Sequence, residues 1–249
     1  MVNVRCGAIE FSQVQAVIFD KDGTLADSKQ YLCQLGHQRA HHLTLAIGSR
    51  ATKDFKQSLL RSWGVTKNCV DPTGQIAVAS QAEEEVATAG QLTSLGYGWI
   101  DALEIVKRSF DAVELTQASL TPAFAGVGDC LRGLHGAGLK VGILSSDSTD
   151  SVKAFANQCD LTPILELSWG SQSADFRKPD PRLFHRACAA LGVDTYRTLM
   201  VGDSRADIEM ANRAEAQGAI GAAWGWPPFE LPGVDVMLDK ISDIAASVY

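Results

Sequence analysis

The chain has 249 residues, of which 46% are hydrophobic and 20% are charged. This length and apolar content allow one large domain or two smaller ones, and they exclude a disordered chain and a miniprotein held together by disulfides. The 29 acidic and 22 basic residues give a formal net charge of −7 without any cluster of Lys and Arg, so neither a nucleic acid nor an anionic membrane is expected as a partner.

Short apolar segments that stop at polar residues or glycine predict the strands of a sheet. The first of these covers residues 14–19, and the others cover residues 139–144, 164–167, 199–201, 219–224 and 234–238. Helical patterns accompany them at residues 127–134, 148–157, 181–191, 205–216 and 240–248. Near-continuous apolar strands that alternate with helices predict an α/β fold with a doubly wound, Rossmann-like parallel sheet.

One long segment after the first strand breaks this alternation. It lacks a strand pattern, and it contains predicted helices at residues 29–47, 52–63, 79–90 and 99–115. The breaks between them are ordinary helix stops and turns. The sequence therefore predicts an inserted α-helical domain at residues 28–120, within an α/β core made of residues 1–27 and 121–249.

Four polar segments lie at or just beyond predicted strand ends. Because the carboxyl ends of parallel strands meet at one edge of a sheet, we expect their side chains to gather there. The polar residues that these segments contribute are, in chain order, Asp20, Asp22, Ser145, Lys178, Asp203 and Asp207.

The residue types in this set favour phosphate chemistry. Two carboxylates at a strand exit can act as a nucleophile and an acid/base. Carboxylate oxygens in this number suit Mg²⁺, which also binds water and the phosphate oxygens of a substrate. A phosphate at the metal needs a hydroxyl donor and an ammonium, which Ser145 and Lys178 can supply. The set is consistent with phosphoryl transfer to an aspartate.

In this order the four segments resemble the motifs of the haloacid dehalogenase-like hydrolase superfamily, in the branch similar to phosphoglycolate phosphatases. The resemblance is carried by residues 19–25, 143–145, 178–181 and 201–203, with Asp207 after the last of them. It covers about residues 14–28 and 120–238. The helical block at residues 28–120 stands where that family carries its cap domain.

The resemblance implies a role for each residue. Asp20 would attack phosphorus and form an aspartyl-phosphate, while Asp22 would protonate the leaving oxygen and then deprotonate the attacking water. The resemblance also implies a Mg²⁺ ion held by the Asp20 carboxylate, the Asp22 backbone carbonyl and Asp203, with direct or water-mediated support from Asp207. Ser145 would hydrogen-bond the phosphoryl oxygens, and Lys178 would offset the negative charge.

Two positions depart from the family pattern. Lys21 stands where many relatives carry an apolar residue, and its side chain is expected to point away from the face that carries Asp20 and Asp22. Ser146 and Asp147 follow Ser145, where relatives commonly have Asn. We expect this difference to alter contacts around the phosphate or the approach to the cap.

Each singled-out residue also has a structural interpretation. Asp20 and Asp22 fit a turn after a strand, Ser145 fits a helix N-cap, and Asp207 fits a first-turn acid favoured by the helix dipole. Lys178 alone would be a surface lysine. Arg50, in the inserted domain, fits either a contact with an anionic substrate or a solvated basic helix face.

Together these features predict a Mg²⁺-dependent phosphatase, monomeric or homodimeric, that hydrolyses small phosphorylated metabolites. Phosphoglycolate, a sugar phosphate, a nucleoside monophosphate and pyrophosphate are all open as substrates. A phosphomutase would keep the same residues and return the phosphoryl group to a second hydroxyl. A non-catalytic regulatory protein on the same fold is the third alternative, but it would not need an aligned nucleophile, acid and metal site.

The cysteines and the chain's start indicate the compartment. The six cysteines are scattered without a C-x-x-C pair, which predicts reduced core residues of a cytosolic protein. Residues 1–10 do not form the apolar region of a signal peptide, and no apolar run approaches the roughly 18 residues of a membrane span. We therefore expect a cytoplasmic protein.

Overall fold

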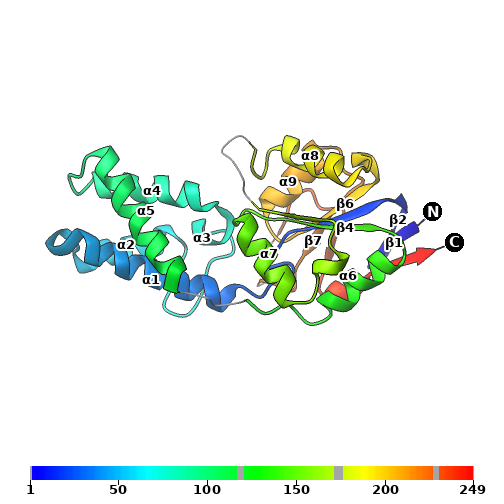
Figure 1. Ribbon diagram of the computed structural model, residues 1–249, viewed down its shortest axis with the longest axis horizontal. Helices are drawn as coiled ribbons and strands as arrows, with labels where there is room; N and C mark the ends of the chain where they lie inside the picture. Colours follow the sequence, from blue (N-terminus) through cyan, green and yellow to red (C-terminus); the bar gives the residue numbers. More distant parts are fainter. Residues whose placement is uncertain (1, 117–120, 171–175, 227–229, 249) are drawn as a thin grey trace. The chain divides into compact units, whose positions relative to one another are not determined.

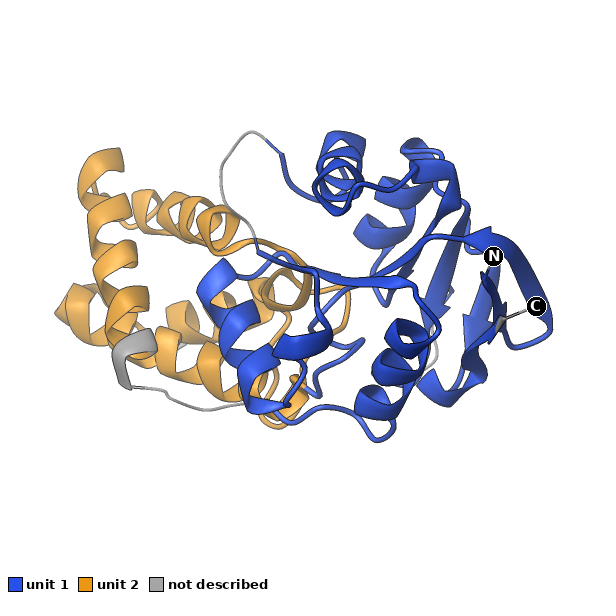
Figure 2. Cartoon of the chain, turned by 45° about the vertical axis from the view of Figure 1, so that its right-hand side comes forward, with its two compact units in different colours: residues 1–27, 121–249 blue, residues 28–120 orange. Residues whose placement is uncertain are grey.

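The computed structural model describes residues 2–116, 121–170, 176–226 and 230–248. The chain forms two compact units, one made of residues 1–27 and 121–249 and the other of residues 28–120 (Figure 2).

A six-stranded parallel sheet forms the centre of the first unit. Its strand order is β5-β4-β3-β6-β7-β8, and every neighbouring pair is parallel. The strands are β3 (Ala16–Phe19), β4 (Lys140–Leu144), β5 (Leu167–Trp169), β6 (Thr198–Gly202), β7 (Gly218–Ala222) and β8 (Val236–Leu238). The first strand of the sheet in the chain thus lies in its interior, between β4 and β6.

Helices cover both faces of this sheet. In Figure 1, α8 (Pro181–Leu191) and α9 (Arg205–Arg213) lie above it, and α6 (Val127–Gly136) and α7 (Thr149–Gln158) lie below it. Side chains alternate along β3, so that Ala16 and Ile18 pack into the core with α8 and α9, while Val17 and Phe19 pack into the core with α6 and α7. The predicted doubly wound α/β fold is confirmed.

A second, antiparallel sheet joins the two ends of the chain. Its order is β2-β1-β9, with β1 (Val2–Cys6), β2 (Ile9–Val14) and β9 (Ile244–Val248). The predicted helix at residues 240–248 is therefore wrong. This segment has apolar residues at helical spacing, but it pairs with β1, and Ile244 packs in the same core as Val4. A short apolar segment fits either period, and here the distant partner strand decides.

The second unit is helical in its described part. Its helices are α1 (Lys29–Ile47), α2 (Lys53–Ser62), α3 (Gln75–Val78), α4 (Gln81–Thr93) and α5 (Trp99–Thr116). Ser80 and Glu83 form a capping box that fixes the start of α4. The core contains a buried ion pair between Arg39 and Glu84, and the Arg39 guanidinium lies 4.3 Å from the centroid of the Phe110 ring.

The structure bears on two further expectations, the burial of the cysteines and the hydropathy of the helices. All six cysteines are free thiols, and Cys6, Cys33, Cys130 and Cys188 are buried as predicted. Cys159 is half-buried and packs against the core of the first unit, whereas Cys69 is exposed, so the prediction of a core position is wrong for Cys69. None of the described helices has the length and hydropathy needed to cross a membrane.

Candidate active site

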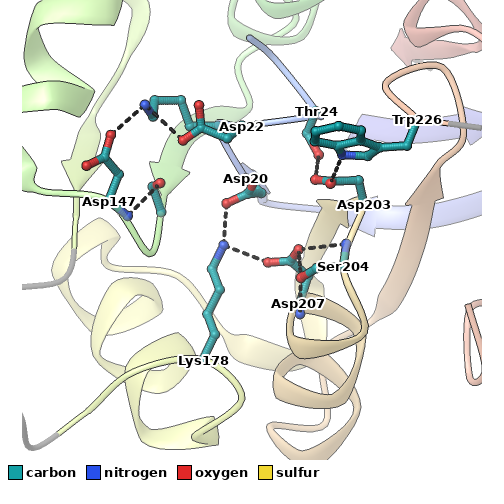
Figure 3. Close-up of polar contacts among 11 residues, drawn as sticks. Asp20, Asp22, Thr24, Asp147, Lys178, Asp203, Ser204, Asp207 and Trp226 are labelled. Atoms are coloured by element: carbon teal, nitrogen blue, oxygen red, sulfur yellow. Dashed lines mark hydrogen bonds and ion pairs between the residues drawn. The ribbon is translucent and has the colours of Figure 1, made fainter. Parts of the chain in front are cut away.

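The predicted site residues of the first unit gather at one edge of the parallel sheet. Asp20 directly follows β3, Ser145 follows β4, and Asp203 follows β6, and these three strands are neighbours. Figure 3 shows the side chains of Asp20 and Asp203 at this edge. Phe19 is in register with Ile143 and Val201, so the three chain exits lie at the same level. The Asp20 amide donates a hydrogen bond to the Val201 carbonyl at 2.9 Å, which fixes the start of the first loop.

Lys178 links two of the carboxylates. Its Nζ lies 2.5 Å from Asp20 Oδ1 and 2.6 Å from Asp207 Oδ1, and all three side chains are buried. Burial alone would lower the pKa of Lys178, but Asp20 and Asp207 outweigh it and raise that pKa. Lys178 is therefore an ammonium ion at neutral pH, and it is not the surface lysine of the structural alternative.

Hydrogen bonds fix the carboxylates of both Asp203 and Asp207. The Asp207 carboxylate accepts hydrogen bonds from the amide and the hydroxyl of Ser204, which caps the helix. Asp203 Oδ1 accepts a hydrogen bond from Thr24 at 2.8 Å, and Oδ2 accepts one from the Trp226 indole at 2.6 Å. The functional set predicted from the sequence lacks Thr24 and Trp226. Thr24 could have been noticed as the hydroxyl in the first polar segment, whereas nothing in the sequence placed Trp226 beside Asp203.

Three carboxylates form a candidate metal site. Among the described residues, Asp20, Asp203 and Asp207 each offer an oxygen within 4.8 Å of the others. Burial raises the pKa of Asp20 to about 7, with Lys178 opposing and Asp207 and Asp22 adding to the rise. Burial and the nearby carboxylates also raise the pKa of Asp203 well above its usual value. Crowded, buried oxygen donors with excess negative charge are a donor set that fits Mg²⁺.

Gly23 allows this arrangement. Its φ of +82° lies in the left-handed region that glycine tolerates. A Cβ atom at this position would lie 2.2 Å from Trp226 Nε1 and 2.4 Å from Asp203 Oδ2. The first loop can therefore approach Asp203 and Trp226 only because position 23 has no side chain.

Asp22 lies apart from the three clustered carboxylates. Its side chain is 18% exposed, and its Oδ2 is 2.9 Å from Lys21 Nζ. The expectation that Lys21 points away from Asp22 is wrong. The alternation of an extended chain ends at Phe19, because the Lys21 carbonyl accepts hydrogen bonds from the amides of Leu25 and Ala26 in a tight turn.

Ser145 is buried at the end of β4. Its hydroxyl oxygen accepts a hydrogen bond from the Asp147 amide at 3.1 Å. Ser148, and not Ser145, is the N-cap of α7. With its acceptor engaged by Asp147, the Ser145 hydroxyl can offer its proton to an anionic ligand.

Arg50 belongs to the helical unit. Its guanidinium carbon lies 4.5 Å from the centroid of the Tyr97 ring, which is a cation–π contact within that unit. A contact between Arg50 and a substrate stays a prediction.

One known family and several known proteins resemble this chain along most of its length. The model of a hydrolase family, described as haloacid dehalogenase-like hydrolase, matches residues 14–215. The phosphoglycolate phosphatase of Salmonella typhimurium (strain LT2) is 26% identical over 247 residues, which cover 94% of this chain and 92% of that protein.

Solved structures share the fold. A crystal structure described as a "predicted phosphoglycolate phosphatase" from Haemophilus somnus has a TM-score of 0.69 at 21% identity, with 93% of this chain and 96% of that chain covered. The structure of CbbY from Rhodobacter sphaeroides in complex with phosphate has a TM-score of 0.59 at 18% identity, with 92% and 95% covered.

Proposed function

The chain belongs to the haloacid dehalogenase-like hydrolase family, and from that membership we propose that it is a Mg²⁺-dependent phosphatase of small phosphorylated metabolites. The observation that carries this proposal is the buried Asp20 carboxylate, which directly follows β3 and lies 2.5 Å from Lys178 Nζ among two further carboxylates. A binding protein would have no need for three clustered, buried acids, two of them paired with one lysine, because their burial opposes ionisation.

Asp20 is the nucleophile of the proposed reaction. One of its carboxylate oxygens attacks phosphorus, the bond between phosphorus and the leaving oxygen breaks, and an aspartyl-phosphate forms. Lys178 stays protonated beside Asp20 and stabilises the negative charge of the phosphoryl group. The Ser145 hydroxyl donates a hydrogen bond to a phosphoryl oxygen.

Asp22 is the acid and then the base. It gives its proton to the leaving oxygen, and it later takes a proton from the water that hydrolyses the aspartyl-phosphate. The partial exposure of its side chain, 18%, supports this role, because the group must meet both the leaving group and a water molecule.

The residues that would hold Mg²⁺ are the Asp20 carboxylate, the Asp22 backbone carbonyl and Asp203, with Asp207 in direct or water-mediated contact. When bound, Mg²⁺ supplies positive charge to the phosphoryl oxygens. Asp207 also accepts a hydrogen bond from Ser204 and forms an ion pair with Lys178. Because these partners already occupy its carboxylate, a water-mediated contact with Mg²⁺ is favoured.

The leaving group is selected by the helical unit in this proposal, which takes residues 28–120 as the cap domain. Phosphoglycolate is the first compound to test, because relatives over nearly the whole chain are phosphoglycolate phosphatases. Sugar phosphates, nucleoside monophosphates and pyrophosphate complete the panel. If Arg50→Ala leaves the KM of the best substrate unchanged, Arg50 has no part in substrate binding.

The test is phosphate release from p-nitrophenyl phosphate and from this panel, with Mg²⁺ and with a chelator. We expect release only with Mg²⁺, and none from Asp20→Asn. Asp129→Asn is the matched control, because the side chain of Asp129 is 90% exposed, and it should behave as the wild type. An Asp20→Asn enzyme with wild-type turnover would refute the proposal. An isomerised sugar phosphate without phosphate release would instead identify a phosphomutase.

A further inference from the structure

Lys21 is a buried lysine that the proposed reaction leaves without a task. It is 2% exposed, and it lies in the first loop between the two catalytic acids in sequence. Its Nζ is 2.9 Å from Asp22 Oδ2, 2.8 Å from Asp147 Oδ2 and 3.3 Å from Ser151 Oγ. An ammonium has three N–H donors, and these three oxygens can engage all of them.

The partners of Lys21 come from separate parts of the sheet edge. Asp147 lies in the loop after β4, and Ser151 lies in the first turn of α7. In Figure 3, Asp147 and Asp22 face each other across the ammonium. The ammonium is therefore anchored on one side by α7 and its preceding loop, and on the other side it contacts the carboxylate of Asp22.

Asp147 holds two groups at once. Its Oδ2 accepts a hydrogen bond from the Lys21 ammonium, and its Oδ1 accepts a hydrogen bond from the Ser148 amide at 2.6 Å. Its own amide donates to Ser145 Oγ at 3.1 Å. One residue thus fixes both the serine at the proposed phosphate site and the lysine that contacts the proposed acid.

We infer that Lys21 is a positioning residue, which is anchored by Asp147 and fixes the carboxylate of Asp22 for proton transfer to the leaving oxygen. This inference rests on the proposed function. The geometry of proton transfer is demanding, because the acid must lie within hydrogen-bond reach of the leaving oxygen. A partly exposed aspartate without such a contact would sample several rotamers, and few of them would satisfy this condition.

A purely structural role for Lys21 makes a different prediction. If the ammonium only neutralised Asp147 and stabilised the loop, its removal would slow all substrates by the same factor. If it positions the acid, its removal should slow most the substrates whose leaving oxygen must be protonated. The p-nitrophenyl leaving group departs as a stable phenolate without a proton. The p-methoxyphenyl leaving group has almost the same size, but its more basic oxygen needs a proton as it leaves.

The experiment compares Lys21→Met with the wild type on p-nitrophenyl phosphate and p-methoxyphenyl phosphate, at saturating Mg²⁺. The quantity is kcat/KM, which reports the steps up to formation of the aspartyl-phosphate. We expect kcat/KM to fall on the order of 10²-fold for the methoxyphenyl compound and by less than about threefold for the nitrophenyl compound. Lys153→Met is the matched control, because Lys153 is exposed on α7, and it should leave both values unchanged.

A second variant tests the anchor if Lys21→Met does not fold. Asp147 is 36% exposed, so Asp147→Ala removes the partner of Lys21 without a buried cavity. It should show the same selective loss, whereas Asp147→Asn, which keeps an oxygen acceptor, should recover much of the activity. Asp150→Ala, at an exposed position in the first turn of α7, is the control.

The outcomes separate the inference from the function on which it rests. In an Asp22→Ala background, Lys21→Met should cause little further loss, because both changes remove the same proton transfer. An active wild type whose Lys21→Met or Asp147→Ala variant slows both aryl phosphates equally, or slows neither, refutes the inference alone. A wild type that releases no phosphate from these two compounds or from any member of the metabolite panel refutes the proposed function and the inference with it.

Discussion

The Lys178 ammonium lies 2.6 Å from the Asp207 carboxylate, although Lys178 lies in the loop before α8 and Asp207 lies in the first turn of α9. The same Nζ is 2.5 Å from Asp20, so one buried cation joins the end of β3 to the start of α9. Asp207 in turn accepts hydrogen bonds from Ser204, the N-cap of α9. The helix start thereby fixes the lysine, and the lysine fixes the proposed nucleophile.

The first prediction concerns this lysine. Lys178→Met should lower kcat roughly 10²–10³-fold, because it removes a fixed donor from the site where negative charge develops. Steady-state phosphate release at saturating Mg²⁺ is the measurement. Lys140→Met is the control, since Lys140 pairs with Glu166 at the opposite end of β4. A Lys178→Met enzyme within threefold of the wild type would contradict the proposed role.

The second prediction concerns the stability of the metal-free protein. Burial and neighbouring carboxylates raise the pKa of Asp20 to about 7 and that of Asp203 well above its usual value. The unfolded chain releases these protons near an ordinary pKa of about 3.9, so the folded state binds more protons between these values. The stabilisation is present in full below about pH 4, and it is lost as the pH rises through about 7.

We therefore expect Tm in a chelator to fall as the pH rises from about 5 to about 8. Partial burial of Asp147 raises its pKa, but Lys21 outweighs this effect and lowers that pKa, so the contribution of Asp147 to stability is lost only as the solution becomes more acidic than this range. Saturating Mg²⁺ should remove most of the fall, because it competes with protons for the same oxygens. Asp203→Asn should flatten the slope and Asp129→Asn should not. A Tm in chelator that rises with pH over this range would show the prediction to be wrong.

Local sequence patterns predicted the parallel sheet and the gathering of polar residues at one of its edges. Apolar runs that end in polar residues indicate strands without reference to distant parts of the chain. A parallel sheet then brings the ends of these strands together. Strand β9 escaped prediction because its partner, β1, lies at the other end of the chain. The apolar spacing of residues 241–248 alone fits a helix as well as a strand.

Two contacts at the site depend on how the loops fold. Lys21 reaches Asp22 because the chain turns directly after β3, which the alternation of an extended strand does not foresee. Trp226 meets Asp203 because the segment after β7 passes beside the first loop at Gly23. Neither contact has a sequence signal, since the first depends on the conformation of a turn and the second on where two loops meet.

The third prediction concerns the core of the helical unit. Glu84→Gln should destabilise the protein by about 3–5 kcal/mol, because it removes the charge that balances the buried Arg39 guanidinium. Chemical denaturation followed by circular dichroism measures this loss. Glu104→Gln, at an exposed position on α5, should change stability by no more than about 0.5 kcal/mol. If Arg39→Met with Glu84→Leu is no more stable than Glu84→Gln alone, the buried unpaired charge is not the cause.

The fourth prediction concerns Trp226, whose indole N–H donates to Asp203 Oδ2 at 2.6 Å. Thr24 donates to the other oxygen, so the two hydrogen bonds together fix the plane of the carboxylate. Partners that orient a metal ligand typically account for about 10–100-fold in metal affinity. Trp226→Phe keeps most of the ring but removes the donor, so the Mg²⁺ concentration for half-maximal activity should rise by about tenfold.

Fluorescence measures the same event without turnover. Mg²⁺ binding at Asp203 should change the emission of the neighbouring Trp226 indole, and titration of the wild-type protein should give the Mg²⁺ affinity directly. Trp226→Phe should lose this signal, whereas Trp99→Phe, which removes a half-exposed indole in the helical unit, should retain it. A Trp226→Phe protein with unchanged fluorescence response and unchanged Mg²⁺ dependence would show that this indole does not support the metal ligand. An unchanged response with a weakened Mg²⁺ dependence would keep the hydrogen bond to Asp203 and assign the emission change to another tryptophan.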